Sequence, residues 1–498
     1  MHQYAGLQSY ITASNGFPIY NSPTGAIVNA GVPYYIYGEN PALWDDRRLM
    51  QGLELKSDTR GLFDYDLVVS HLLYLSVINQ QSSNYGIDTS GQNWDQSGSG
   101  WVTADARGVW RPEQEFLGKH EVSFGGHFDQ YALRQYFTYG PDWAAFAGNI
   151  PYGESRGITQ TDALYVQDEW SFLPNWKLIA GGREEFWSTF DGAGLNYVPF
   201  PTAAPFPYGF ASAWQTVSQG NNYYQSRSVT AFSPKASLSY QATDDLTLRG
   251  SFGNAKRFPT VSELYQLQAF TYGTVVNNPR LLPEQVDSYD LTAEYRFGKN
   301  LARLSYFHED RWDEIVSQTF QTVGAPVTGY QNVPKTHFNG VEGAVQLKDV
   351  ATPGLDVNAS VTYVAATVLS DPHYSDPNFA ALPWLNYPAL NPAGKNYPLI
   401  PRWRAKWVVT YHPTEQWSVS GAMRYASNPY ALLDNVDYNH ATYGAMSGYL
   451  VFDARATYKF DKYWTFAAGI NNIGNYHQYD YHPFEQRTFF AEIKFDFK

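Results

Sequence analysis

Two short segments hold the residues of this chain whose types and spacing most suggest chemistry. They read KRFPTVSELY over Lys256–Tyr265 and NPRLLPE over Asn278–Glu284. They place Arg257 near two carboxylates, Glu263 and Glu284. An arginine beside carboxylates can contact a polar ligand or can simply satisfy the polarity of a partly buried wall. We expect the structural role to dominate at this cluster.

A second set of candidates consists of aromatic residues in segments rich in Pro, Gly and Asn. Aromatic planes and phenolic hydroxyls suit bulky, partly apolar ligands. Trp and Tyr also form girdles at membrane interfaces, so residue type leaves both roles open. The candidates for ligand binding are Tyr272, Trp384, Tyr387, Tyr397, Tyr430 and Tyr438.

No catalytic motif is convincing, and the sequence therefore predicts a protein that is not an enzyme and has no cofactor. The chain has no Gly-x-Ser-x-Gly elbow, no phosphate-binding glycine loop before Lys and Ser or Thr, and no His-Glu-x-x-His. Cysteine is absent, which removes thiolate chemistry and disulfides. The nearest approach to a metal set, His477, Asp480 and His482, is expected to be solvated, so no metal site is predicted.

Composition excludes further classes. Only 16% of the 498 residues are charged while 17% are aromatic, and the net charge of −13 argues against a nucleic-acid partner. The most apolar run, Leu67–Ile78, contains Ser and His and is shorter than the ~20 residues that a membrane helix needs. A membrane barrel stays compatible with the mean hydropathy of −0.41, because its strands alternate lipid-facing and water-facing residues.

The chain end shows such alternation. Phe489, Ala491, Ile493 and Phe495 fall on one face of a strand, and the charged residues between them fall on the other. The same period of two recurs over 289–297, 403–411 and 450–460. A soluble sandwich could alternate in this way too, so the period alone does not choose between the two folds.

Connection lengths separate these folds. Tight links such as Gln241–Asp245 and Gly298–Asn300 alternate with long ones such as Phe258–Pro283 and Ser370–Pro401. Short turns at one rim and long loops at the other are typical of outer-membrane barrels, where they are periplasmic and extracellular. The sequence therefore predicts an all-β transmembrane antiparallel barrel with about 17 strands from near Gln51. His308, Glu309 and Asp310 are expected at the lumen and rim of a strand end.

The opening of the chain is expected to differ from the rest. Residues 1–49 are rich in Tyr, Gly, Pro and Asn and lack the basic start and apolar core of a signal peptide. We expect residues 1–49 to be the remnant of an extracellular loop, and residues 50–498 to form the barrel.

Several separated motifs resemble those of TonB-dependent outer-membrane receptors. They are the two segments of Lys256–Tyr265 and Asn278–Glu284, together with ALYVQDEW at 163–170, FSPKASLSY at 232–240, NGVE at 339–342 and GINNIG at 469–474. The resemblance spans about Gln51 to Lys498 and implies a 22-stranded barrel, of which about 17 strands are present. It also implies that the plug domain and first strands are absent from this sequence, as in a truncated or split chain. Lys498 departs from the aromatic residue on which the family usually ends.

What the resemblance implies about function is active import of a scarce nutrient across the outer membrane of a Gram-negative cell. A ferric siderophore is the commonest class of ligand, and partners would be membrane lipid and the TonB complex, contacted through a plug outside this chain. Arg257, Glu263 and Glu284 would face the lumen and the plug. The alternatives are a passive porin-like channel and, disfavoured because no acid and base stand paired, an outer-membrane enzyme.

Overall fold

A computed structural model gives the fold of the chain. The residues that it describes are 2–5, 11–12, 18–19, 27–29, 32–34, 42–82, 91–142, 150–196, 222–266, 268–270, 273–320, 327–371, 392–435, 437, 439–441 and 445–497.

Long β-strands make up most of the described chain. Seventeen of them have eight residues or more: β6 Ala42–Lys56, β7 Phe63–Ser82, β9 Gly100–Trp110, β10 Lys119–Gly140, β11 Ile150–Leu173, β12 Trp176–Asn196, β14 Arg227–Gln241, β15 Leu246–Arg257, β18 Glu284–Phe297, β19 Asn300–Phe320, β20 Val327–Leu347, β21 Leu355–Ser370, β22 Trp403–Tyr411, β23 Trp417–Ala426, β24 Tyr449–Lys459, β25 Trp464–Asn471 and β28 Thr488–Phe495.

Shorter elements lie at the margins of these strands. They are β1 His2–Ala5, β2 Ile11–Thr12, β3 Pro18–Ile19, β4 Ile27–Asn29, β5 Val32–Tyr34, β8 Gly91–Asp95, β13 Asn222–Tyr223, β16 Gln268–Phe270, β17 Gly273–Val276, β26 Tyr479–Asp480, β27 His482–Pro483 and the helix α2 Val261–Tyr265. No helix in the described ranges is long and apolar enough to cross a membrane.

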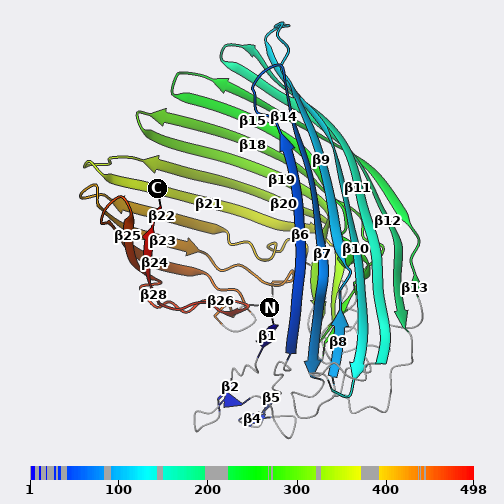
Figure 1. The fold of residues 1–498 in the computed structure, drawn as a ribbon. Coiled ribbons are helices and arrows are strands. Elements are labelled where there is room, and N and C mark those ends of the chain that lie inside the picture. The colour runs from blue at the N-terminus through cyan, green and yellow to red at the C-terminus, as the bar shows by residue number, and fades with distance from the viewer. Residues whose placement is uncertain are drawn as a thin grey trace.

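The long strands form an antiparallel meander. Each one pairs with the next long strand in the chain, from β6 with β7 through to β25 with β28. Figure 1 shows them side by side in one curved sheet. The prediction of an all-β antiparallel fold with about 17 strands is confirmed.

One face of the sheet is apolar and exposed. Leu291, Tyr306 and Val341 are directly opposite one another on β18, β19 and β20. Leu291 is 63% exposed, as expected for a residue that faces lipid rather than a protein core. With Leu238, Leu248 and other side chains, these residues line a shallow apolar hollow of about 590 Å³.

The opposite face is polar. Thr292 lies next to Leu291 but points to the other side, where its hydroxyl lies 2.7 Å from Ser305 Oγ on β19. The helix α2 packs on this second face, through contacts with β10, β11 and β12. We refer to the polar face as the lumen face and to the apolar one as the outer face.

Aromatic pairs gather on the outer face where strands meet the short turns. Ring centroids lie 4.3 Å apart for Trp176 and Tyr240, and 4.5 Å apart for Trp464 and Phe495. Trp417 and Tyr458 repeat the arrangement at 4.7 Å. Such belts are typical of the membrane–water interface.

The strand β6 begins earlier than the alternation indicates. The expected boundary at residue 50 falls inside β6, which already starts at Ala42. A register shift between Arg47 and Arg48 interrupts the period of two at this point. Four consecutive charges from Asp45 to Arg48 also hide the strand, although Asp45 pairs with Arg47 on one face at 2.9 Å.

Candidate functional site

The helix α2 follows β15 inside the long connection that contains the first motif. Thr260 precedes the helix, and its hydroxyl accepts a hydrogen bond from the backbone N–H of Glu263 at 3.3 Å. The Glu263 carboxylate in turn accepts from the backbone N–H of Thr260 at 2.8 Å. This reciprocal capping box allows a helix of only five residues to form in a loop. The Thr-x-x-Glu spacing was visible in the sequence, but no helix was predicted there.

Tyr265 fixes this helix on the lumen face. Its side chain is 1% exposed, and its hydroxyl lies 2.9 Å from Thr189 Oγ1. The ring lies against two glycines on neighbouring strands, Gly157 on β11 and Gly192 on β12. A Cβ atom at either glycine would lie within 2.5 Å of the ring. Only glycine leaves room for the aromatic ring at these two positions.

The structure brings Arg257, Glu263 and Glu284 together at the base of the helix. Arg257 donates two parallel hydrogen bonds to Glu284, at 2.8 and 2.7 Å, and a third to Glu263 at 3.0 Å. Glu284 also accepts from the backbone N–H of Ile315 at 2.6 Å. The guanidinium is thus occupied by two carboxylates, which is the geometry of a charge-assisted clamp between β15, α2 and β18.

A second charged cluster lies beside the first, on β19. Glu314 is 6% exposed and accepts hydrogen bonds from Arg311 at 2.9 Å, Thr336 at 2.7 Å and the hydroxyl of Tyr397 at 2.9 Å. Arg311 also lies 4.0 Å from the ring centre of Phe338. This buried carboxylate therefore ties β19 and β20 to the segment around Tyr397.

Two further side chains clamp the second motif to the wall. Arg227 donates to the carbonyls of Pro279 and Leu281, at 2.5 and 2.8 Å. Asn332 accepts from the N–H of Leu282 at 2.9 Å and donates to its carbonyl at 3.0 Å. Neither residue stands out in the sequence, because each acts on backbone groups some 50 positions away.

Of the aromatic candidates, Tyr397 and Tyr430 belong to the described residues. The ring of Tyr397 packs 5.1 Å from that of Phe338, and burial together with Glu314 raises the pKa of its hydroxyl. Tyr430 lines a hollow of about 440 Å³ with Asn396, Arg402 and Asn428. The remaining four, Tyr272, Trp384, Tyr387 and Tyr438, lie outside the described residues.

A basic hollow on the lumen face was not predicted. It has a volume of about 340 Å³ and is lined by Arg404, Lys406 and Arg424 together with Glu342 and Tyr449. Arg424 pairs with Asp453 at 3.1 Å. Arg404 and Lys406 are exposed and pair with no carboxylate of the described chain. They alternate with Trp403, Ala405 and Trp407, so the period of two already indicated that they face water.

The two groups of histidine-containing candidates, at 477–482 and at 308–310, differ in the structure. His477, Asp480 and His482 are exposed, and among the described residues they do not converge as a metal-binding group. Glu309 points into the lumen, where it binds Arg311 at 2.7 Å. Its neighbours His308 and Asp310 point to the outer face, since adjacent strand residues face opposite sides.

The fold is shared with solved structures of other proteins. "Copper transporter OprC" aligns with a TM-score of 0.65 at 16% identity, over 93% of this chain and 67% of that one. The ferric citrate transporter FecA in its unliganded form aligns with a TM-score of 0.66 at 16% identity, over 92% of this chain and 62% of that one. The siderophore receptor PiuA from Acinetobacter baumannii aligns with a TM-score of 0.64 at 13% identity, over 92% of this chain and 65% of that one. The chain thus spans about two thirds of the length of these structures.

No curated protein matches the sequence. A family match extends over residues 3–473, and the family is described as "TonB dependent receptor-like, beta-barrel". The capped helix, the Arg257 clamp and every long strand of the sheet except β28 lie within that range. The chain belongs to the TonB-dependent receptor β-barrel family.

Proposed function

We propose that this chain supplies the wall and loops of an outer-membrane importer that takes up an anionic metal chelate, most simply a ferric siderophore. Family membership supports TonB-dependent import. The observation that carries the ligand class is a lumen hollow that holds two cations, Arg404 and Lys406, with no carboxylate partner among the described residues. Cations held in a confined polar cleft attract anions and raise their local concentration.

In this proposal the ligand enters from the side of the long connections. Tyr430 and the hollow that it lines would contact the apolar part of the ligand, together with Tyr272, Trp384, Tyr387 and Tyr438. Tyr397 would act differently, because its hydroxyl is already bound to Glu314. It would hold the segment that carries the hollow rather than contact the ligand.

The Arg257 clamp would serve the machinery rather than the ligand. Arg257, Glu263 and Glu284 satisfy one another, so they offer a fixed polar surface on the lumen face and no free charge for an incoming anion. We propose that this surface faces a plug, through which the TonB complex would act.

The ligand class is tested by removing the two cations of the lumen hollow, Arg404 and Lys406. We expect the double substitution Arg404→Gln and Lys406→Gln to weaken binding of an anionic ferric chelate such as ferric citrate by about 10-fold or more. Each lost charge contact is worth about 1 kcal/mol or more in a partly desolvated site. The measurement is quenching of tryptophan fluorescence in the detergent-solubilised chain.

The matched control is Arg296→Gln, which removes a lumen cation close to the short-turn rim, where it pairs with Glu294. The affinity of this variant for the ferric chelate should equal that of the parent protein. Equal affinity of the double variant would contradict the anionic ligand class. A large ligand-independent conductance in planar bilayers, without any saturable binding, would instead favour the passive porin.

A further inference from the structure

The outer face changes from apolar to polar within two residues of the Leu291–Tyr306–Val341 row. Moving away from the short turns, the next row is Tyr289, His308 and Asn339, and the row after it contains Asp310 opposite His337. In a barrel this level lies at the membrane surface, beyond the apolar band. Polar side chains here can reach ions from water without crossing hydrocarbon.

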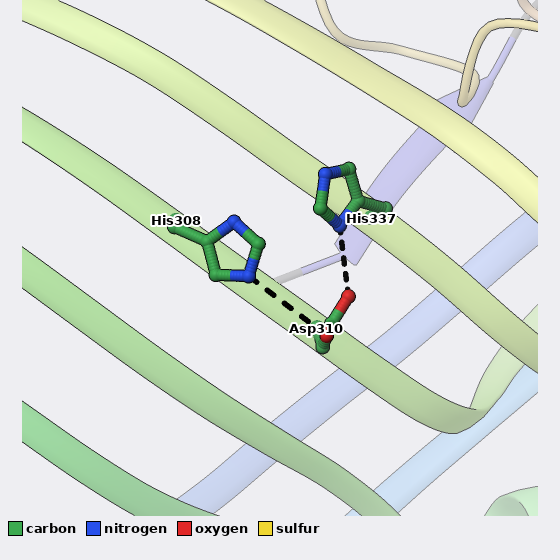
Figure 2. A group of neighbouring side chains, drawn as sticks. All are labelled: His308, Asp310 and His337. Carbon is green, nitrogen blue, oxygen red and sulfur yellow. Dashed lines mark hydrogen bonds and ion pairs between the residues drawn. The ribbon is translucent and has the colours of Figure 1, made fainter.

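Two imidazoles and one carboxylate converge at this level. Figure 2 shows His308 and His337 on either side of Asp310, with ring nitrogens directed at the carboxylate. His337 Nδ1 lies 2.8 Å from Asp310 Oδ1, and His308 Nε2 lies 3.8 Å from Oδ2. One ligand atom from each residue lies within 4.8 Å of the others. The side chains are 26%, 26% and 27% exposed, so they are ordered by the wall yet open to solvent.

The distances from the Asp310 oxygens to the two histidine nitrogens are close to those between ligands of a tetrahedral metal ion. Zinc lies about 2.0–2.1 Å from histidine nitrogen, which places neighbouring ligands at about 3.3 Å. The distance from Asp310 to His337 is shorter than that value and the distance from Asp310 to His308 is longer. The register fixes two of the ligands on opposite strands, because Asp310 and His337 are direct partners of β19 and β20.

Asn339 orients His308. Its Oδ1 lies 2.8 Å from His308 Nδ1 and also accepts from Tyr306 at 3.2 Å. A proton held on His308 Nδ1 leaves the lone pair of Nε2 for a metal, as outer-shell partners of zinc ligands commonly do. Asn339 also contacts His337 Nε2.

We propose that His308, Asp310 and His337 form a binding site for a divalent transition metal of the zinc class on the outer wall of the barrel. Two imidazole nitrogens and one carboxylate oxygen are a donor set for Zn²⁺, Cu²⁺ or Ni²⁺ rather than for Ca²⁺ or Mg²⁺, which prefer oxygen. The metal binds the lone pair of His337 Nδ1, so the neutral ring carries its proton on Nε2. The proton that Nδ1 shares with Asp310 therefore moves to Nε2 or is released to water, and a water molecule fills the open coordination position. The ion joins β19 to β20.

Lys335 is the competitor for this site. Its ammonium lies 4.0 Å from Asp310 Oδ2 and 5.2 Å from the ring centre of Trp312. In the absence of metal it partly neutralises the carboxylate that the ion would use. Removal of this charge should therefore favour the metal.

The test is zinc titration of the tag-free chain in detergent after removal of metal with a chelator. Calorimetry should detect one equivalent of Zn²⁺ that His308→Gln and His337→Gln each weaken at least ~10-fold, the lower end of the effect of disturbing even an outer-shell partner. With Cu²⁺, the electron paramagnetic resonance spectrum should show coupling to two nitrogens in the parent and a reduced number in each variant. Zinc should also raise the unfolding temperature of the parent protein.

The matched control is His120→Gln. His120 lies 2.7 Å from Asp168 and is a single imidazole beside a carboxylate, so its loss should leave zinc binding unchanged. Lys335→Met should bind zinc more tightly, an effect that a folding defect would not produce. Equal zinc binding by the parent and both histidine variants would overturn the proposal, as would an unchanged affinity of the Lys335 variant.

Discussion

At the scale of single residues, the most constrained contact is that of Tyr265 with two glycines. We expect Gly157→Ala to destabilise the folded barrel by about 1–3 kcal/mol, because the new Cβ would lie 2.2 Å from the ring and force it to move. The measurement is the free energy of unfolding from denaturant titration in detergent or lipid.

Gly253→Ala on β15 is the control for this prediction. A Cβ there meets nothing closer than the Ser288 hydroxyl, at 3.6 Å. The double variant Gly157→Ala with Tyr265→Ala should show that the two costs are not additive, since the clash needs the ring. Additive costs would mean that position 157 matters for a reason other than Tyr265.

Residue identity alone predicted part of the site. Arg257, Glu263 and Glu284 lie in recognisable motifs, and the structure places them in one cluster. His337 could not be linked to Asp310 in advance, because 27 positions separate them and only the register of β19 and β20 brings them together. The clamps by Arg227 and Asn332 were hidden for the same reason, since they bind backbone groups that carry no sequence signal.

At the scale of elements, the second motif is held to the wall from both sides. We expect Arg227→Met to loosen the 279–282 segment, because the carbonyls of Pro279 and Leu281 then lose their charged donor. A hydrogen bond to a charged group contributes about 1.5–3 kcal/mol, so local opening should become at least ~10-fold more frequent. The measurement is amide hydrogen exchange of Arg280–Leu282.

The control for the Arg227 variant is Arg249→Met on β15. Arg249 also faces the lumen and donates to Ser239 at 3.1 Å, but it does not contact the 279–282 segment. Exchange in that segment should stay at the parent rate in this control. Unchanged exchange in Arg227→Met would mean that Asn332 and the packing of Leu281 are sufficient to hold the segment.

Elements with a regular period were predictable, and interrupted ones were not. The alternation of β18, β24 and β28 follows from side chains that face lipid on one side and water on the other. The start of β6 was missed because a bulge and a run of charges break the period. Helix α2 was missed because five residues are too few for a helical period, so only its capping box could have indicated it.

At the scale of the whole molecule, the sheet separates two solvents. This assignment predicts that neighbouring residues on one strand lose different amounts of unfolding free energy on the same substitution. Leu291→Arg on the outer face should cost about 2–4 kcal/mol of unfolding free energy in phospholipid vesicles, the depth-dependent penalty for a charge in the apolar band. Thr292→Arg on the lumen face should cost only about 1 kcal/mol, from the lost hydrogen bond to Asp290.

The comparison between these two variants is informative because both introduce the same side chain at the same depth. Strand propensity, charge and size then cancel, and the difference reports which face meets lipid. Repeating the titration in detergent micelles should reduce the difference, since a micelle deforms around a charge more readily than a bilayer does. Equal costs in vesicles would show that neither face of β18 is embedded in lipid, and a larger cost for Thr292→Arg would mean that the lumen and outer faces are interchanged.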